Sequence, residues 1–123
     1  SEYLSTANNG KGIILGGITG VPPTKVIIIG AGTVAEFVAR AALGLGAEVQ
    51  VFDNHIYKLR RIKHLVGHQI YTSTIDTITL SEALRSADVV IGALRAEKGR
   101  ARHVVTDEMV ANMKPDSLII DLS

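Results

Sequence analysis

Two glycines and one carboxylate have the residue types and spacing that could bind a dinucleotide. Gly30 and Gly32 follow the apolar run Val26–Ile29, and Ala35 stands at the third position of a G-x-G-x-x-G/A pattern. In this pattern the first glycine makes a tight turn, the second lets a pyrophosphate approach the backbone, and the third lets helix and strand pack closely. Asp53 closes the next apolar run 23 positions after Gly30, near the ~20 positions expected of a ribose-binding acid. We therefore predict dinucleotide binding; the alternative is a glycine turn with a structural role alone.

Asp53 also favours one coenzyme over the other. A carboxylate at the end of the second strand accepts hydrogen bonds from both ribose hydroxyls and repels a 2′-phosphate, which predicts NAD rather than NADP. The alternative is an aspartate that only caps a turn or a helix. An amphipathic pattern opens directly after Gly32, and the N–H groups and dipole at a helix amino end suit a phosphate.

Basic side chains give a less specific indication. Lys58 lies on a basic helix face with Arg60, Arg61, Lys63 and His64, which could meet the coenzyme or be a solvated face of an amphipathic helix. The charged segment 95–103 could meet a substrate carboxylate or a phosphate. It could equally be a solvated loop or a contact with another domain.

The sequence contains no motif for metal binding or for nucleophilic catalysis. The four histidines (His55, His64, His68 and His103) lack metal-ligand spacing, and there is no cysteine, so we predict no metal site. No nucleophile–base motif such as G-x-S-x-G occurs. The motifs of these 123 residues therefore offer no candidate for nucleophilic catalysis.

The bulk composition describes a globular chain. Hydrophobic residues make up 46% of it and the formal net charge is +1, which leaves no electrostatic case for nucleic acid or a membrane surface as partner. No apolar run approaches the ~18 residues of a membrane span. The amino terminus does not read as a signal peptide, so a cytoplasmic protein is expected.

The elements that would position these residues alternate between strands and helices. Apolar runs predict strands at 26–29, 48–52, 69–72, 88–92 and 117–123. Helical patterns cover 33–43 and 55–66, a third helix opens at a capping box in 79–82, and Thr106 caps a fourth that ends at Pro115. This order predicts an α/β, Rossmann-type doubly wound parallel sheet in three layers, with ligands at the carboxyl ends of the strands.

Apolar spacing assigns an inward face to each of the first two helices. In the first, the predicted stripe is Val34, Phe37, Val38, Ala41, Ala42 and Leu45; in the second it is Ile56, Leu59, Ile62 and Val66. We expect residues 1–24 to be a connecting segment and 25–123 to be the coenzyme-binding domain. Because the last apolar run stops at the chain end without a closing helix, we expect a fragment of a larger two-domain protein.

Five segments together resemble the coenzyme domain of alanine dehydrogenases. They are 16–23, 25–32, 44–54, 87–93 and 113–123, so the resemblance covers nearly the whole chain. The same superfamily includes the coenzyme-binding subunit of proton-translocating nicotinamide nucleotide transhydrogenase. The Gly-Gly-x-x-Gly-Val-Pro-Pro segment at 16–23 is more similar to the dehydrogenases.

The resemblance implies reversible conversion of L-alanine, NAD and water to pyruvate, NADH and ammonium by a homo-oligomer. It places the substrate lysine and histidine in an amino-terminal domain outside this chain, which would then bind NAD(H) without turning over. Two alternatives remain open: a transhydrogenase subunit and a non-catalytic module that senses NAD.

The resemblance also implies which residues touch the coenzyme. It assigns one group to the pyrophosphate, a second to the adenosine ribose and its surroundings, and a third to the nicotinamide half. These groups are Gly30, Ala31, Gly32, Thr33 and Val34; Asp53, Asn54 and Lys58; and Ala93, Leu94, Arg95 and Leu122. The region 71–75 matches an adenine-contacting loop. Segment 95–103 departs from the apolar, proline-containing run of the family, which leaves the substrate open.

Overall fold

Five short apolar segments pair into one all-parallel sheet in the computed structural model, which describes residues 22–94 and 104–122. The spatial order is β3-β2-β1-β4-β5, with the strands at Lys25–Ile29 (β1), Glu48–Phe52 (β2), Ile70–Ser73 (β3), Val89–Gly92 (β4) and Leu118–Asp121 (β5). The central position of β1 makes it the most protected strand. Its five residues pair with β2 on one side, and four of them pair with β4 on the other.

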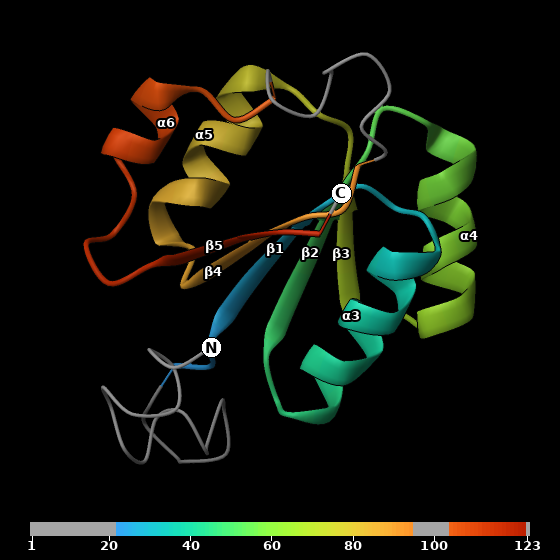
Figure 1. Ribbon diagram of the computed structural model, residues 1–123. Helices are drawn as coiled ribbons and strands as arrows, with labels where there is room; N and C mark the ends of the chain where they lie inside the picture. The colour runs from blue at the N-terminus through green and yellow to red at the C-terminus, as the bar shows by residue number, and fades with distance from the viewer. Residues whose placement is uncertain (1–21, 95–103, 123) are drawn as a thin grey trace.

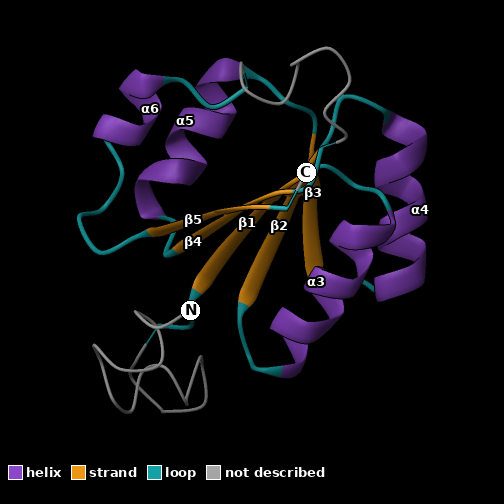
Figure 2. Cartoon of the chain, viewed as in Figure 1, coloured by secondary structure: helices purple, strands orange, loops and turns teal. Residues whose placement is uncertain are grey.

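Helices cover both faces of this sheet. They are α3 (Thr33–Gly44), α4 (Ile56–Val66), α5 (Thr77–Ser86) and α6 (Asp107–Ala111). Figures 1 and 2 show α3 and α4 on one face and α5 with α6 on the opposite face. The predicted three-layer, doubly wound α/β fold is confirmed.

Side chains along β1 alternate between two hydrophobic cores, one on each face of the sheet. Val26 and Ile28 pack on the α3–α4 side, whereas Ile27 and Ile29 pack on the α5–α6 side, and all four are at most 5% exposed. A strand that is buried on both faces requires an unbroken apolar run. This requirement explains why the sequence signal for β1 is continuous and not alternating.

The inward face of α3 matches the predicted stripe only in part, with Val38 and Ala42 packed against the core. Ala35 and Ala39 are fully buried against the sheet, whereas Phe37 is 68% exposed, and Val34 and Leu45 are also exposed. Apolar residues lie on both sides of this helix, so spacing alone could not give its rotation. The small alanine side chains face the sheet because they let the helix axis approach it closely.

Two further expectations about helices are corrected. In α4, Leu59 and Ile62 are buried as predicted, but Ile56 at its amino end is exposed. The capping box predicted at 79–82 is wrong, because α5 begins earlier and Asp76 is its N-cap. The Asp76 carboxylate accepts hydrogen bonds from the Thr79 N–H at 3.0 Å and the Thr79 hydroxyl at 2.9 Å. The Thr106 cap of α6 is confirmed by its bond from the Met109 N–H at 3.1 Å.

The chain changes direction across the sheet at β1. The segment after β1 leads through α3 to β2, while β4 flanks β1 on the other side, with Ile29 opposite Gly92. The loops that follow β1 and β4 therefore emerge side by side. This is the switch point at which doubly wound sheets bind ligands.

Candidate dinucleotide-binding site

The turn after β1 requires glycine at its first position. Gly30 has a φ of +113°, and its N–H donates to the Phe52 carbonyl of β2 at 2.6 Å. A Cβ atom at this position would lie 2.7 Å from both the Ala93 carbonyl carbon and its oxygen. Backbone conformation and close approach both exclude a side chain here.

The second glycine faces open space. Gly32 is the N-cap of α3, and a Cβ built on it would meet no atom within 4 Å. N–H groups in the first turn of a helix have no partner within the helix, so the backbone of 32–34 offers donors beside this opening. Ala35, the third position of the pattern, is fully buried. Turn, open approach and close packing thus fall at the three expected positions.

Asp53 is a buried carboxylate that links two loops. Only 2% of the residue is exposed. Its Oδ2 accepts the Ala31 N–H at 2.9 Å, and its Oδ1 accepts the His55 N–H at 2.8 Å. The Nδ1 atom of the His55 ring lies 2.9 Å from the same Oδ1. Asp53 therefore holds the glycine turn in position, which is a structural role in addition to the predicted ribose contact.

A small cavity collects most of the predicted site residues. It has a volume of about 70 Å³, and its lining comes from the loops after β1, β2 and β4 and from the first turn of α4: Gly30, Ala31, Gly32, Asp53, Lys58, Ala93 and Leu94. All of these residues belong to the predicted coenzyme contacts. The structure thus joins side chains that are far apart in the sequence at the switch point.

The remaining predicted residues lie around or beyond this cavity. Thr33 and Val34 open α3 and are exposed, and Asn54 is exposed next to Asp53. The Leu122 N–H donates to the Gly92 carbonyl at 2.7 Å, which fixes the chain after β5 beside the end of β4. Arg95, with the rest of the predicted basic segment 95–103, lies outside the described residues.

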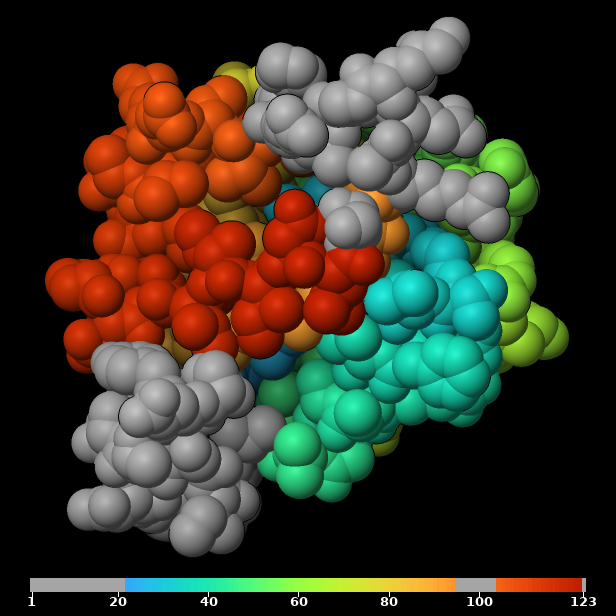
Figure 3. All heavy atoms as spheres, in the orientation of Figure 1, coloured from blue at the N-terminus to red at the C-terminus, as the bar shows by residue number. Residues whose placement is uncertain are grey.

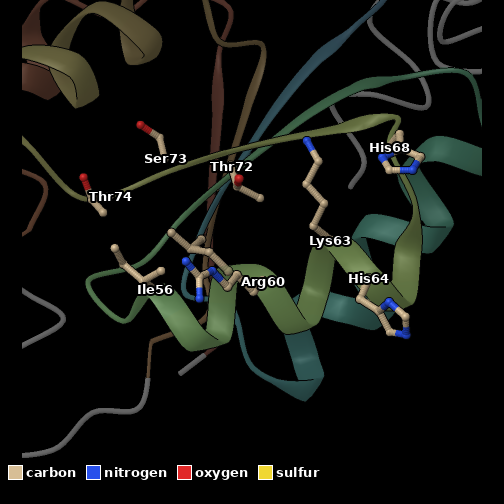
Figure 4. Close-up of a pocket in the computed structure, with 9 residues that line it drawn as sticks. Ile56, Arg60, Lys63, His64, His68, Thr72, Ser73 and Thr74 are labelled. Carbon is tan, nitrogen blue, oxygen red and sulfur yellow. The ribbon is translucent and has the colours of Figure 1, made fainter.

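A larger cavity of about 490 Å³ lies between α4 and β3. This cavity was not predicted from the sequence, although the basic face of α4 and the predicted adenine-contacting region were the signals that could have indicated it. Its lining residues are Ile56, Leu59, Arg60, Lys63, His64, His68, Thr72, Ser73 and Thr74, most of them drawn in Figure 4. Within it the Lys63 Nζ donates to the Ile70 carbonyl at 3.0 Å, so one of these charges is used to tie α4 to β3.

Residues 22–94 and 104–122 contain neither a metal-ligand cluster nor a helix able to cross a membrane. These residues hold no group of three or more His, Asp or Glu side chains placed to bind a metal ion. Within the same ranges, no helix has both the length and the apolar character needed to cross a membrane.

The parallel sheet, the glycine turn at its switch point and the acid at the end of β2 define a Rossmann-type dinucleotide-binding domain. The family model described as the C-terminal domain of alanine dehydrogenase/PNT, where PNT denotes pyridine nucleotide transhydrogenase, matches residues 1–123. The chain belongs to this family.

Individual relatives agree with the family match. The alanine dehydrogenase of Mycolicibacterium smegmatis is 40% identical over 98% of this chain and 33% of its own length. A solved L-alanine dehydrogenase is 32% identical, with a TM-score of 0.82 over 98% of this chain and 34% of its own. A transhydrogenase from Sinorhizobium meliloti is 25% identical, with a TM-score of 0.70 over 95% and 36%. The chain thus spans about a third of the length of these relatives.

Proposed function

We propose that this chain is the coenzyme-binding domain of an alanine-dehydrogenase-type oxidoreductase and that residues 25–123 hold NAD(H). One observation carries the proposal. The buried Asp53 carboxylate is hydrogen-bonded to the glycine turn at Ala31, next to the open approach at Gly32. A ribose-binding acid and a pyrophosphate-binding backbone are therefore held at a fixed separation at the switch point of the sheet.

Separate groups of residues in this site suit the pyrophosphate, the adenosine ribose and the nicotinamide half of a dinucleotide. The backbone N–H groups of Gly32, Thr33 and Val34 suit the pyrophosphate because the amino end of α3 is a site of positive potential. Asp53 would accept the hydroxyls of the adenosine ribose, with Asn54 and Lys58 nearby. Ala93, Leu94, Arg95 and Leu122 would border the nicotinamide half. The role of this chain is to bind and orient the coenzyme.

For the complete protein we propose the reversible conversion of L-alanine, NAD and water to pyruvate, NADH and ammonium. Bound NAD supplies the hydride acceptor in this chemistry. Alanine and pyruvate would be bound by a lysine and a histidine of another domain, to which residues 1–24 connect. The proposal includes a cytoplasmic homo-oligomer, in keeping with the family resemblance.

The transhydrogenase alternative is the weaker one. Its solved relative superposes less well on this chain than the solved L-alanine dehydrogenase does, with TM-scores of 0.70 and 0.82, and it is also less identical, 25% against 32%. An assay of the complete protein separates the two activities, because only a dehydrogenase of this type makes NADH formation depend on L-alanine.

Calorimetric titration with NAD and then NADP tests the proposed site. We expect saturable NAD binding and much weaker NADP binding, because a 2′-phosphate would be placed against the Asp53 carboxylate. Equal affinity for the two coenzymes would contradict the role given to Asp53. No binding of either by the complete protein would contradict the proposed function.

A further inference from the structure

The acceptor positions of Asp53 are almost fully used in this structure. An ionised carboxylate offers about four lone-pair positions, two on each oxygen. Oδ2 uses one for the Ala31 N–H, while Oδ1 faces both the His55 N–H and the His55 ring. A ribose diol that binds both oxygens needs one position on each. Oδ2 has one left, but both positions on Oδ1 are taken.

The backbone and ring contacts of His55 differ in how easily they can be released. The His55 N–H belongs to the main chain at the N-cap of α4 and stays in place with the helix. The side chain of His55 is 57% exposed and forms no capping bond to α4. Its ring packs edge-on to the exposed Tyr57, with ring centres 5.7 Å apart. The ring can therefore turn into solvent without opening the core.

We propose that the His55 imidazole occupies the ribose position on Asp53 Oδ1 and swings away when the coenzyme binds. This inference rests on the proposed function, because it assumes that Asp53 receives the adenosine ribose. His55 is then a positioning residue that sets coenzyme affinity by competing within the chain.

The direction of the change in NAD affinity on removing the His55 ring distinguishes competition from a direct contact between the ring and the coenzyme. If the ring must leave before the ribose binds, its removal strengthens binding by the free energy of the lost ring–carboxylate bond. A hydrogen bond of this kind contributes about 0.5–1.5 kcal/mol net, which corresponds to a gain in affinity of about twofold to tenfold. If the ring instead contacted bound coenzyme, its removal would weaken binding.

The test compares two variants that lack the ring nitrogen. His55→Ala removes the ring, and because the side chain makes no capping bond, α4 keeps its N-terminal hydrogen bonds. His55→Phe keeps an aromatic ring next to Tyr57 but has no Nδ1 atom. Arg85→Ala is the control, because it removes an exposed side chain from the last turn of α5, on the opposite face of the sheet from α4 and outside the candidate site. Each is titrated with NAD in the complete protein, and thermal unfolding confirms that each is folded.

A second ligand checks that the gain comes from the ribose diol. NAD that lacks the adenosine 2′-hydroxyl presents one hydroxyl there, for which Oδ2 has a position without moving the ring. We expect both His55 variants to bind NAD about twofold to tenfold more tightly than wild type. The gain should disappear with the deoxy ligand, and Arg85→Ala should match wild type with both.

The outcomes separate this inference from the proposed function. Saturable NAD binding by wild type with unchanged or weaker binding by both His55 variants would overturn the inference and leave the proposed function standing. A gain that persists with the deoxy ligand would also overturn it. Absence of NAD binding by wild type and variants alike would overturn the proposed function and the inference with it.

Discussion

At the scale of single residues, Asp53 joins the turn after β1 to the loop after β2 through one carboxylate. The bond from the Ala31 N–H fixes the turn, and the bond from the His55 N–H fixes the start of α4. Asp53 also lines the cavity that includes Lys58. The structural role and the proposed binding role therefore fall on one carboxylate, and a substitution here is expected to affect both.

Replacing Asp53 with alanine should lower stability and coenzyme affinity together. The buried Ala31 N–H would lose its partner, at a cost of about 1–3 kcal/mol in the free energy of unfolding. Loss of a charged acceptor for the ribose should weaken NAD binding by about tenfold to a hundredfold. Denaturant unfolding and calorimetric titration measure the two effects. Unchanged NAD affinity in a folded Asp53→Ala protein would remove the ribose role.

The two glycines of the turn should respond differently to alanine. At Gly32 an added Cβ enters open space, so stability should change by less than about 1 kcal/mol, while NAD affinity falls by at least about tenfold because the pyrophosphate approach is blocked. At Gly30 the same change adds about 1–3 kcal/mol of backbone strain and a clash with Ala93. Chemical denaturation and NAD titration of both variants measure this. Normal NAD binding by Gly32→Ala would contradict the site.

At the scale of elements, the rotation of α3 about its own axis sets how closely this helix approaches the sheet. Its buried side is made of alanines, while Phe37 is exposed. Figure 3 shows α3, coloured cyan to teal, as part of the molecular surface. Close approach aligns the amino end of α3 with the turn after β1. The small residues thus serve the site as well as the core.

Enlarging a buried alanine of α3 should therefore cost more than trimming its exposed phenylalanine. Ala39→Leu adds three carbons to a side chain that is 0% exposed. Overpacking of this kind costs about 1–3 kcal/mol in the free energy of unfolding. Phe37→Ala is the matched control and should change it by no more than about 0.5 kcal/mol. Equal effects measured by denaturant unfolding would contradict the observed rotation of α3.

The amino end of α5 should show a pH-dependent contribution to stability. Hydrogen bonds from the Thr79 N–H and hydroxyl lower the pKa of Asp76 from its ordinary value of 3.8. A pKa that is lower in the folded state stabilises the fold at pH above the unfolded value, and this contribution is lost as the pH falls through the folded value. The difference in melting temperature between wild type and Asp76→Ala should therefore shrink in acid.

Asp76→Asn is the control for this pH effect. Asparagine keeps an oxygen that can cap α5 but has no proton to gain. Its melting temperature relative to Asp76→Ala should then stay constant with pH. A wild-type difference that is equally independent of pH would contradict the role of the charged cap.

The sequence predicted this fold well where one interaction dominates the local choice. Continuous apolar runs identified the central strands β1 and β4, because strands covered on both faces tolerate few polar residues. The edge strands β3 and β5, also predicted, are only partly buried. The inward face of α3 was predicted only in part: Val38 and Ala42 pack against the core as expected, but apolar residues occupy both sides of the helix, and only contact with the sheet selects Ala35 and Ala39. The start of α5 was missed because Asp76 and Thr79 both resemble caps in the sequence.

Some features of the candidate site were also predictable from the sequence, and others were not. The positions of Gly30, Gly32 and Asp53 followed from spacing because the turn needs those residue types at fixed distances along the chain. The bond between Asp53 and Ala31 and the contact of the His55 ring depend on side-chain rotation, which spacing does not encode. The role of Arg95 and its segment stays a prediction.

At the scale of the whole molecule, the candidate coenzyme site and a set of polar contacts between strands lie at opposite ends of the sheet. At the amino ends, the Asp88 carboxylate accepts the Lys25 N–H at 2.8 Å and pairs with the Lys114 ammonium at 2.7 Å. The candidate site lies at the opposite, carboxyl ends. We expect NAD binding by this domain to be separable from the turnover proposed for the complete protein.

We accordingly expect this chain alone to bind NAD and to form no NADH when L-alanine is added. The complete protein should form NADH under the same conditions, because the substrate-binding lysine and histidine are proposed to lie in another domain. Titration measures the binding, and the absorbance of the reduced nicotinamide measures turnover. Alanine-dependent NADH formation by residues 1–123 alone would contradict this division.

The bond between Asp53 and the glycine turn has a consequence for protein engineering. A designer who wishes to switch the preference to NADP would first replace this acid, so as to make room for a phosphate. In this chain that replacement also releases the Ala31 N–H, and the turn loses the contact that fixes it. A successful switch should therefore need a second substitution that supplies a new acceptor to Ala31, so that altered selectivity is not obtained at the expense of a disordered turn.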